Sequence, residues 1–155
     1  ASSLAFWIET ALLEWEFAAR GGLSRKKFPW GNELVPKGKH YMNTWQGKFP
    51  NLNTEDDGWY GTAPTDAFPP NGFGLFNMTG NVWEWVQDFY GPRPMPKRLP
   101  ERDPKGPANG TQRIQRGGSY LCHESYCDRY HVHSRIPSEP TNSAGHSGFR
   151  VACDP

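Results

Sequence analysis

The stretch "GLFNMTGNVWEWVQDFY", residues 74–90, sets the expected fold of this chain. Gly80 and Asn81 predict a tight turn, because both residue types tolerate the backbone angles that a turn needs. The residues after the turn alternate with the period of a strand. One face of that strand would carry Val82, Glu84 and Val86, and the other Trp83 and Trp85. We therefore expect a turn followed by an aromatic strand.

Other elements can be placed around this strand. Residues 8–20, "IETALLEWEFAAR", predict a helix, since Leu12, Trp15 and Ala19 recur every three or four positions and two glycines follow. The segments "RIQRGGSY" (113–120) and "GFRVAC" (148–153) predict two more strands. Between them, residues 91–112 hold six prolines and mixed charge, which indicates a mobile surface loop.

Composition limits the classes of protein that remain. The chain has 155 residues, enough for one domain, and its 17 basic residues nearly balance 16 acidic ones. We expect neither a nucleic-acid nor a membrane partner, because no basic excess and no apolar run of about 20 residues is present. The first residues, "ASSLAFWIETALL", lack the pattern of a secretory leader. Seventeen glycines, fifteen prolines and seven tryptophans indicate a loop-rich chain packed around large aromatic side chains.

A second stretch, "GGSYLCHESYC" (117–127), carries the chemistry, because it places Cys122 and Cys127 five positions apart. A straight strand would put their side chains on opposite faces, and a helix would put them about 140° apart. Only a bend, which "HESY" can supply, brings the sulfurs together. The pair is then two buried thiols, a disulfide, or a two-thiolate site for a soft ion such as Cu(I). Zinc is disfavoured, since no second ligand pair such as CxxC or HxxxH accompanies the nearby histidines.

Several motifs occur together in a recognisable order: "EWEFAARGG", "FPWGN", "NTWQGKFP", "TAPTDAFPPNGFGLFNMTGNVWEW", "RGGSYLCHESYC" and "SGFRVA". In this order the sequence resembles the formylglycine-generating enzyme (sulfatase-modifying factor) family over about residues 14–153. The resemblance implies an α+β, loop-rich fold of the C-type-lectin-like kind with little regular secondary structure. It divides the chain into a divergent segment, 1–13, and the C-terminal part of the catalytic domain, 14–155. The N-terminal half of that domain has no counterpart here, which indicates a fragment or a truncated form.

The resemblance also implies an activity. Catalytic members oxidise a cysteine of an unfolded sulfatase-type polypeptide, within a Cys-x-Pro-x-Arg motif, to Cα-formylglycine with O₂ and Cu(I). Cys122 and Cys127 would hold the copper, and Ser119 would lie near the oxygen pocket. Trp83 and Arg135 would line the substrate cleft, as would His146, which stands where some members have Asn. The alternative is a truncated or non-catalytic lectin-like binding or regulatory module, because half of the domain is missing.

Calcium is the second metal that the resemblance implies, in two sets of oxygen ligands. The first set comprises the side chains of Asn43 and Asp57 and the carbonyls of Thr44 and Trp59. The second comprises the side chains of Asn77 and Glu84 and the carbonyls of Gly80 and Val82. Mixed carboxylate, amide and carbonyl oxygens suit a hard cation. From the residues alone, "NTEDDG" predicts only a solvated acidic turn.

The compartment is also an expectation from resemblance. Members of the ER lumen carry extra structural cysteines, and the matching positions here hold Ala19, Val132 and Val151. This favours the bacterial cytoplasm, with the ER lumen as the alternative. We expect Cys153 to be a free thiol near the C-terminus.

Overall fold

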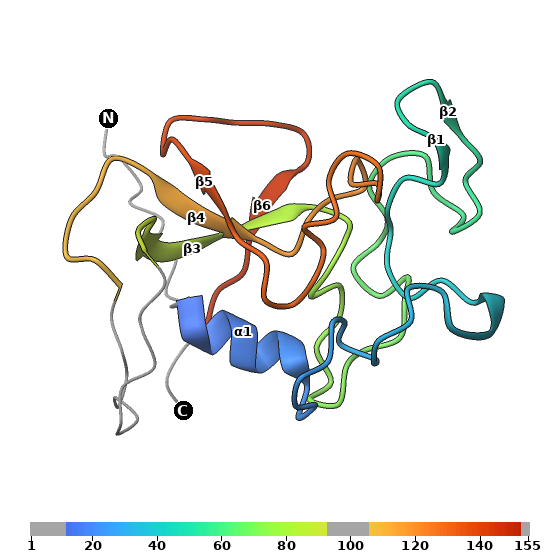
Figure 1. Cartoon of the computed structure of the whole chain (residues 1–155), viewed down its shortest axis with the longest axis horizontal. Coiled ribbons are helices and arrows are strands. Elements are labelled where there is room, and N and C mark those ends of the chain that lie inside the picture. The colour runs from blue at the N-terminus through green and yellow to red at the C-terminus, as the bar shows by residue number, and fades with distance from the viewer. Residues whose placement is uncertain (1–11, 93–105, 153–155) are drawn as a thin grey trace.

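A computed structural model describes residues 12–92 and 106–152 (Figure 1). Helix α1 spans Leu12–Arg20 and is followed by a short 3₁₀ turn, η1, at Pro36–Gly38. Strands β1 (Gly47–Lys48) and β2 (Leu52–Asn53) form a small hairpin. Strands β3 (Trp83–Phe89), β4 (Arg113–Arg116), β5 (Ile136–Ser138) and β6 (Ser147–Phe149) form the main sheet. Most of the described chain lies in turns and loops, and the α+β, C-type-lectin-like fold that we expected is confirmed.

Strand β3 is central in the four-stranded sheet, whose order is β5-β4-β3-β6. It pairs antiparallel with β4, where Glu84 faces Arg116, and parallel with β6, where Trp83 faces Ser147. Helix α1 lies beside this sheet and contacts β3, as Figure 1 shows. The strand predicted from the alternation of residues 82–86 is therefore confirmed, and it holds the middle of the sheet.

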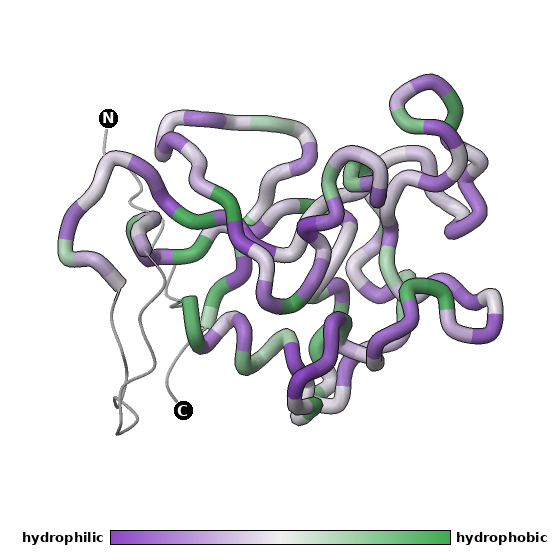
Figure 2. Tube along the Cα trace, viewed as in Figure 1, coloured by the Kyte–Doolittle hydropathy of each residue, from purple (hydrophilic) through white to green (hydrophobic). Residues whose placement is uncertain are grey.

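Two hydrophobic clusters lie on either side of β3. Val86 packs with Trp15 and Ala19 of α1 in the first cluster, together with Ile114 of β4. Trp83 points into the second cluster, which contains both cysteines. Both faces of β3 therefore carry buried side chains, Val86 on one and Trp83 on the other. In Figure 2 hydrophobic (green) and hydrophilic (purple) positions both occur along these elements. Within the described residues no helix has the length and apolarity needed to cross a membrane.

Two of the predicted strands end earlier in the structure than the sequence suggested. Helix α1 is confirmed from Leu12, and residues 8–11 lie outside the described part. Strand β4 stops at Arg116, because Gly117 and Gly118 have φ values of +88° and +76°, which extended backbone does not use. A Cβ at Gly118 would lie 2.9 Å from the Tyr130 side chain. Strand β6 stops at Phe149, and residues 93–105 of the proline-rich loop lie outside the described part.

Candidate functional site: a buried thiol pair

The Cys122–Cys127 segment folds into a tight bend. The His123 carbonyl accepts hydrogen bonds from the backbone N–H groups of Tyr126 (2.9 Å) and Cys127 (2.7 Å). The bend turns the two cysteine side chains toward each other, so that their sulfurs lie 2.9 Å apart. Both side chains are buried, and both are free thiols rather than a disulfide. The predicted bend is therefore confirmed, and it brings the two sulfurs together.

The two thiols share one proton between them. The hydrogen bond from Cys122 lowers the pKa of the Cys127 thiol to about 6, and the nearby Arg129 guanidinium adds to this effect. The same hydrogen bond, together with burial, raises the pKa of Cys122 well above that of an ordinary thiol. Two thiolates at this distance would repel each other strongly. One sulfur therefore ionises, and the thiol of the other donates a hydrogen bond to it. At neutral pH the pair presents one thiolate, the form that binds metals and reacts with electrophiles.

Ser119 supports the pair from the preceding turn and is 1% exposed. Its backbone N–H points at Cys122 Sγ (3.4 Å), and its carbonyl accepts from the Cys122 N–H (2.9 Å). Its hydroxyl accepts from the Leu121 N–H. The structure therefore brings Ser119 directly against Cys122, where its backbone and side chain fix the turn.

Arg129 is a site residue that sequence reasoning missed. Its Nη1 lies 3.9 Å from Cys127 Sγ, where a positive charge favours the thiolate. The signal was present in the sequence, because an arginine two positions after a cysteine can reach back to its sulfur.

The predicted substrate residues divide into two groups. Trp83 packs in the same cluster as both cysteines, with Phe28, Met42 and Tyr130. His146 contacts Trp83 through the backbone, since the His146 carbonyl accepts a hydrogen bond from the Trp83 N–H at 2.8 Å. Arg135 is placed differently: its guanidinium donates to the Gly91 carbonyl (2.7 Å) and lies 4.9 Å from the centre of the Tyr90 ring. These contacts hold Arg135 at the end of β3 and not against the thiols.

Three residues of the first predicted calcium set, Thr44, Asp57 and Trp59, contact one another. The Asp57 carboxylate accepts backbone hydrogen bonds from Thr44 (2.9 Å) and Trp59 (2.9 Å), and one from the Gln46 amide (2.8 Å). The Thr44 carbonyl accepts from the same Gln46 amide. Asn43 is 0% exposed, and its Oδ1 is a buried oxygen without a hydrogen-bond partner in the described part of the chain. An unpartnered buried amide oxygen is a group that a cation could satisfy.

The second predicted set is organised differently. Asn77 Oδ1 is also buried without a partner among the described residues, and this atom fits a cation ligand. The Glu84 carboxylate, however, accepts from the Trp15 indole (2.7 Å) and forms an ion pair with Arg150 (2.7 Å). These contacts already neutralise the Glu84 charge, so the donor set fits a cation less well than the first one does. Calcium binding at both sets stays a prediction.

The chain is similar to known proteins over most of its length. The family model of the sulfatase-modifying factor enzyme 1-like domain matches residues 5–155. The chain belongs to this family. It is 54% identical over 144 residues to the formylglycine-generating enzyme of Thermomonospora curvata, covering 92% of the chain and 48% of that protein. It is also 54% identical over 142 residues to that of Mus musculus, covering 91% and 37%. The chain thus spans about half, or less, of the curated relatives that it matches.

Solved structures agree on the fold of this family member. The Treponema denticola variable protein 1 is 28% identical with a TM-score of 0.68, over 90% of the chain and 44% of that protein. PvdO from Pseudomonas aeruginosa has a TM-score of 0.67 at 23% identity, over 90% and 49%. At that identity PvdO shows the fold alone.

The chain is also 39% identical to a Mus musculus protein named inactive C-alpha-formylglycine-generating enzyme 2, over 90% of the chain and 40% of that protein.

Proposed function

We propose that this chain carries the thiol centre of an oxidase that converts a cysteine of a sulfatase-type polypeptide, within Cys-x-Pro-x-Arg, to Cα-formylglycine with O₂. The observation that supports this most directly is the pair of buried free thiols, 2.9 Å apart, in a bend built for them. Two relatives at 54% identity are named formylglycine-generating enzymes, and this supports the proposal.

Cys122 and Cys127 are the residues that would hold Cu(I). Two convergent sulfurs, one of them ionised at neutral pH, are the donors that a soft monovalent ion prefers. In the part of the chain that the structure describes, no three His, Cys, Asp or Glu side chains gather, so the set is limited to these two sulfurs. Copper bound here would supply the one-electron chemistry that a reaction with O₂ requires.

The chain's own residues shape this centre. Ser119 fixes the orientation of Cys122, and Arg129 stabilises the negative charge on Cys127. Trp83, only 5% exposed, packs in the same hydrophobic cluster as the pair, and this cluster keeps water away from the sulfurs. In the net conversion the side-chain CH₂–SH becomes an aldehyde, the sulfur leaves as sulfide, and an added thiol supplies the remaining electrons for reduction of O₂ to water.

Copper titration tests the metal part of this proposal. The parent chain should bind one more equivalent of Cu(I) than the double variant Cys122→Ser/Cys127→Ser, because serine is a poor ligand for a soft ion. Cys153→Ser is the matched control and should keep that equivalent. Unchanged stoichiometry in the double variant would refute the copper assignment. Mass spectrometry of a Cys-x-Pro-x-Arg peptide tests the oxidation.

A non-catalytic binding module is the second candidate, and one observation favours it. A relative at 39% identity is named inactive. The two candidates differ in the peptide assay, because a binding module would retain the peptide without changing its mass.

A further inference from the structure

Asparagine directly precedes glycine at two places in this chain, Asn71–Gly72 and Asn109–Gly110. In such a pair the side-chain carbonyl carbon of asparagine, Cγ, can close a ring with the backbone nitrogen of glycine. Glycine has no Cβ to shield this nitrogen, and its backbone is freer than that of other residues to adopt the angles that the closure needs. The two pairs therefore share the same intrinsic chemistry, and the fold decides which of them can react.

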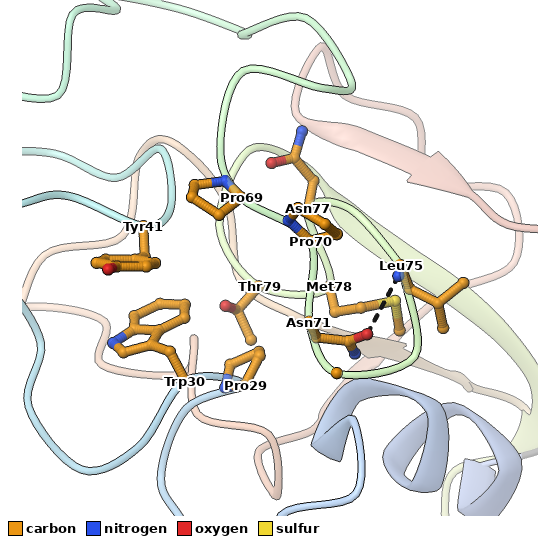
Figure 3. A pocket seen from close by; sticks show the side chains of 11 residues that line it. Pro29, Trp30, Tyr41, Pro69, Pro70, Asn71, Leu75, Asn77, Met78 and Thr79 are labelled. Atoms are coloured by element: carbon orange, nitrogen blue, oxygen red, sulfur yellow. Dashed lines mark hydrogen bonds between the residues drawn. The ribbon is translucent and has the colours of Figure 1, made fainter.

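Asn71 is half-buried, and both ends of its side chain are engaged. Its Oδ1 accepts hydrogen bonds from the backbone N–H groups of Phe73 (2.9 Å) and Leu75 (3.1 Å). Figure 3 shows the bond to Leu75 as a dashed line beside the pocket that Asn71 helps to line. Its amide nitrogen donates to the Ala18 carbonyl of α1 at 2.7 Å. The Asn71 side chain therefore cannot turn onto the Gly72 nitrogen unless these bonds break.

Asn109 lies in the loop that leads into β4, and its surroundings are different. The loop is fastened before this residue, where the Gly106 N–H donates to the Asp88 carboxylate at 2.9 Å. Asn109 itself is exposed, and within the described part of the chain neither its side chain nor the Gly110 N–H forms a hydrogen bond. The Asn109 side chain is thus free to reach the geometry of attack, which Asn71 is not.

We infer that Asn109 is a site of spontaneous deamidation and that the fold protects Asn71 from the same reaction. The Gly110 nitrogen loses its proton and attacks Cγ of Asn109, so that an N–Cγ bond forms while the Cγ–Nδ2 bond breaks. The Nδ2 group leaves as ammonia with the proton from Gly110, and a cyclic imide remains. Water opens this ring at either carbonyl carbon, which leaves aspartate or isoaspartate at this position. No atom is oxidised or reduced, and water is the one co-reactant.

The modification changes both charge and backbone. A neutral amide becomes a carboxylate, so the formal net charge of the chain at pH 7 loses one unit and falls from +1 to 0. A net charge near zero favours self-association. Isoaspartate also adds one carbon to the backbone ahead of β4. No residue of the thiol centre takes part, so the outcome does not depend on the proposed oxidation.

Incubation of the whole chain at mildly alkaline pH, followed by peptide-resolved mass spectrometry, tests the inference. The peptide that contains Asn109 should gain the mass difference between an amide and a carboxyl group, and fragmentation should place this gain at that residue. Its rate should exceed the rate at Asn71 by about a hundredfold, because the hydrogen bonds of Asn71 must break before it can react.

Asn109→Gln is the matched control, because the longer side chain closes its ring far more slowly and should abolish the gain. Gly110 is left unchanged, since a Cβ there would lie 3.0 Å from the Phe89 side chain. In guanidinium chloride the fold is lost, and Asn71 should then react at a rate similar to that of Asn109. Equal rates in the native chain, or no gain at Asn109, would overturn the inference. So would a difference that persists in the denaturant, because neighbouring residues and not the fold would then cause it.

Discussion

At the scale of single residues, the proton shared by the cysteines makes a testable prediction. Alkylation of Cys127 by iodoacetamide should follow its thiolate fraction, with a midpoint near the pKa of about 6 rather than near the ordinary 8.5. In Cys122→Ala the hydrogen-bond donor is gone, so the pKa of Cys127 and the midpoint should rise. Peptide-resolved mass spectrometry separates Cys127 from Cys153. A parent midpoint near 8.5 would contradict the shared proton.

The sequence predicted part of this site and missed part, for reasons that individual residues show. The residues showed that only a bend could bring Cys122 and Cys127 together, and the expectation that they do meet came from the resemblance. The burial of Trp83 beside them was predictable only through resemblance. The place of Arg135 in a substrate cleft stays a prediction, and its contacts with the Tyr90 ring and the Gly91 carbonyl were not predicted. No local pattern in the sequence indicates such a long-range contact.

At the scale of elements, a buried polar contact links α1 to β4. Arg116 is 1% exposed and pairs with Glu16 of α1 at 2.9 Å. It also donates to the carbonyls of Val132 and Ser134 (both 2.8 Å). Arg116→Lys should lower the free energy of unfolding by about 3 kcal/mol, because an ammonium cannot reach all of these acceptors. Denaturant unfolding measures this loss.

Arg20→Lys is the matched control, because Arg20 pairs with the same Glu16 on the surface of the helix. It should cost only about 0.5 kcal/mol, and an equal loss in both variants would contradict the role of Arg116.

Burial alone would raise the pKa of Glu16, but the hydrogen bond of Arg20 and the charge of Arg116 lower it overall. A folded pKa below the unfolded value of 4.5 stabilises the fold fully above pH 4.5. This stabilisation should fade as the pH falls further, and Glu16→Gln should remove it.

Element boundaries also show where sequence patterns stop being informative. Strand β3 was predictable, because alternation over Val82–Val86 is a local property. Strand β5 was not, since Ile136–Ser138 is short and contains Pro137, which reads as a turn. Pro137 is tolerated there because β5 is an edge strand. The parallel pairing of β6 with β3 was equally out of reach, because it joins residues about sixty positions apart through contacts that no local period encodes.

At the scale of the whole molecule, loops dominate, and a bound cation would link segments that share few regular hydrogen bonds. If calcium binds the Asn43–Asp57 set, it stabilises the native state by mass action. EGTA should then lower the Tm of the parent, and Asp57→Ala should blunt that response. Asp66→Ala, at an exposed aspartate outside the predicted ligand set, is the control and should keep the full response. A parent Tm that does not respond to EGTA would show that the calcium assignment is wrong.

The last prediction concerns the activity of the 155-residue chain by itself, which spans 48% of its relative from Thermomonospora curvata. Catalysis requires the substrate cysteine to be held against the thiols, and a displacement of about 1 Å can cost roughly a hundredfold in rate. The described residues supply Cys122, Cys127 and Trp83, whereas Arg135 is held at Tyr90. We therefore expect the 155-residue chain to bind Cu(I) yet to convert a Cys-x-Pro-x-Arg peptide slowly.

A chimaera that joins the N-terminal part of the Thermomonospora curvata relative to this chain should raise conversion by orders of magnitude. Mass spectrometry detects the product, because the peptide loses its thiol and gains an aldehyde. Cys122→Ser in the chimaera should abolish conversion, which ties the gain to the thiol centre and not to the added segment. Equal rates for the chain and the chimaera would show that residues 1–155 hold the substrate unaided. No conversion by a folded, copper-loaded chimaera would favour the binding module, since the thiol pair would then be present without the geometry that oxidation needs.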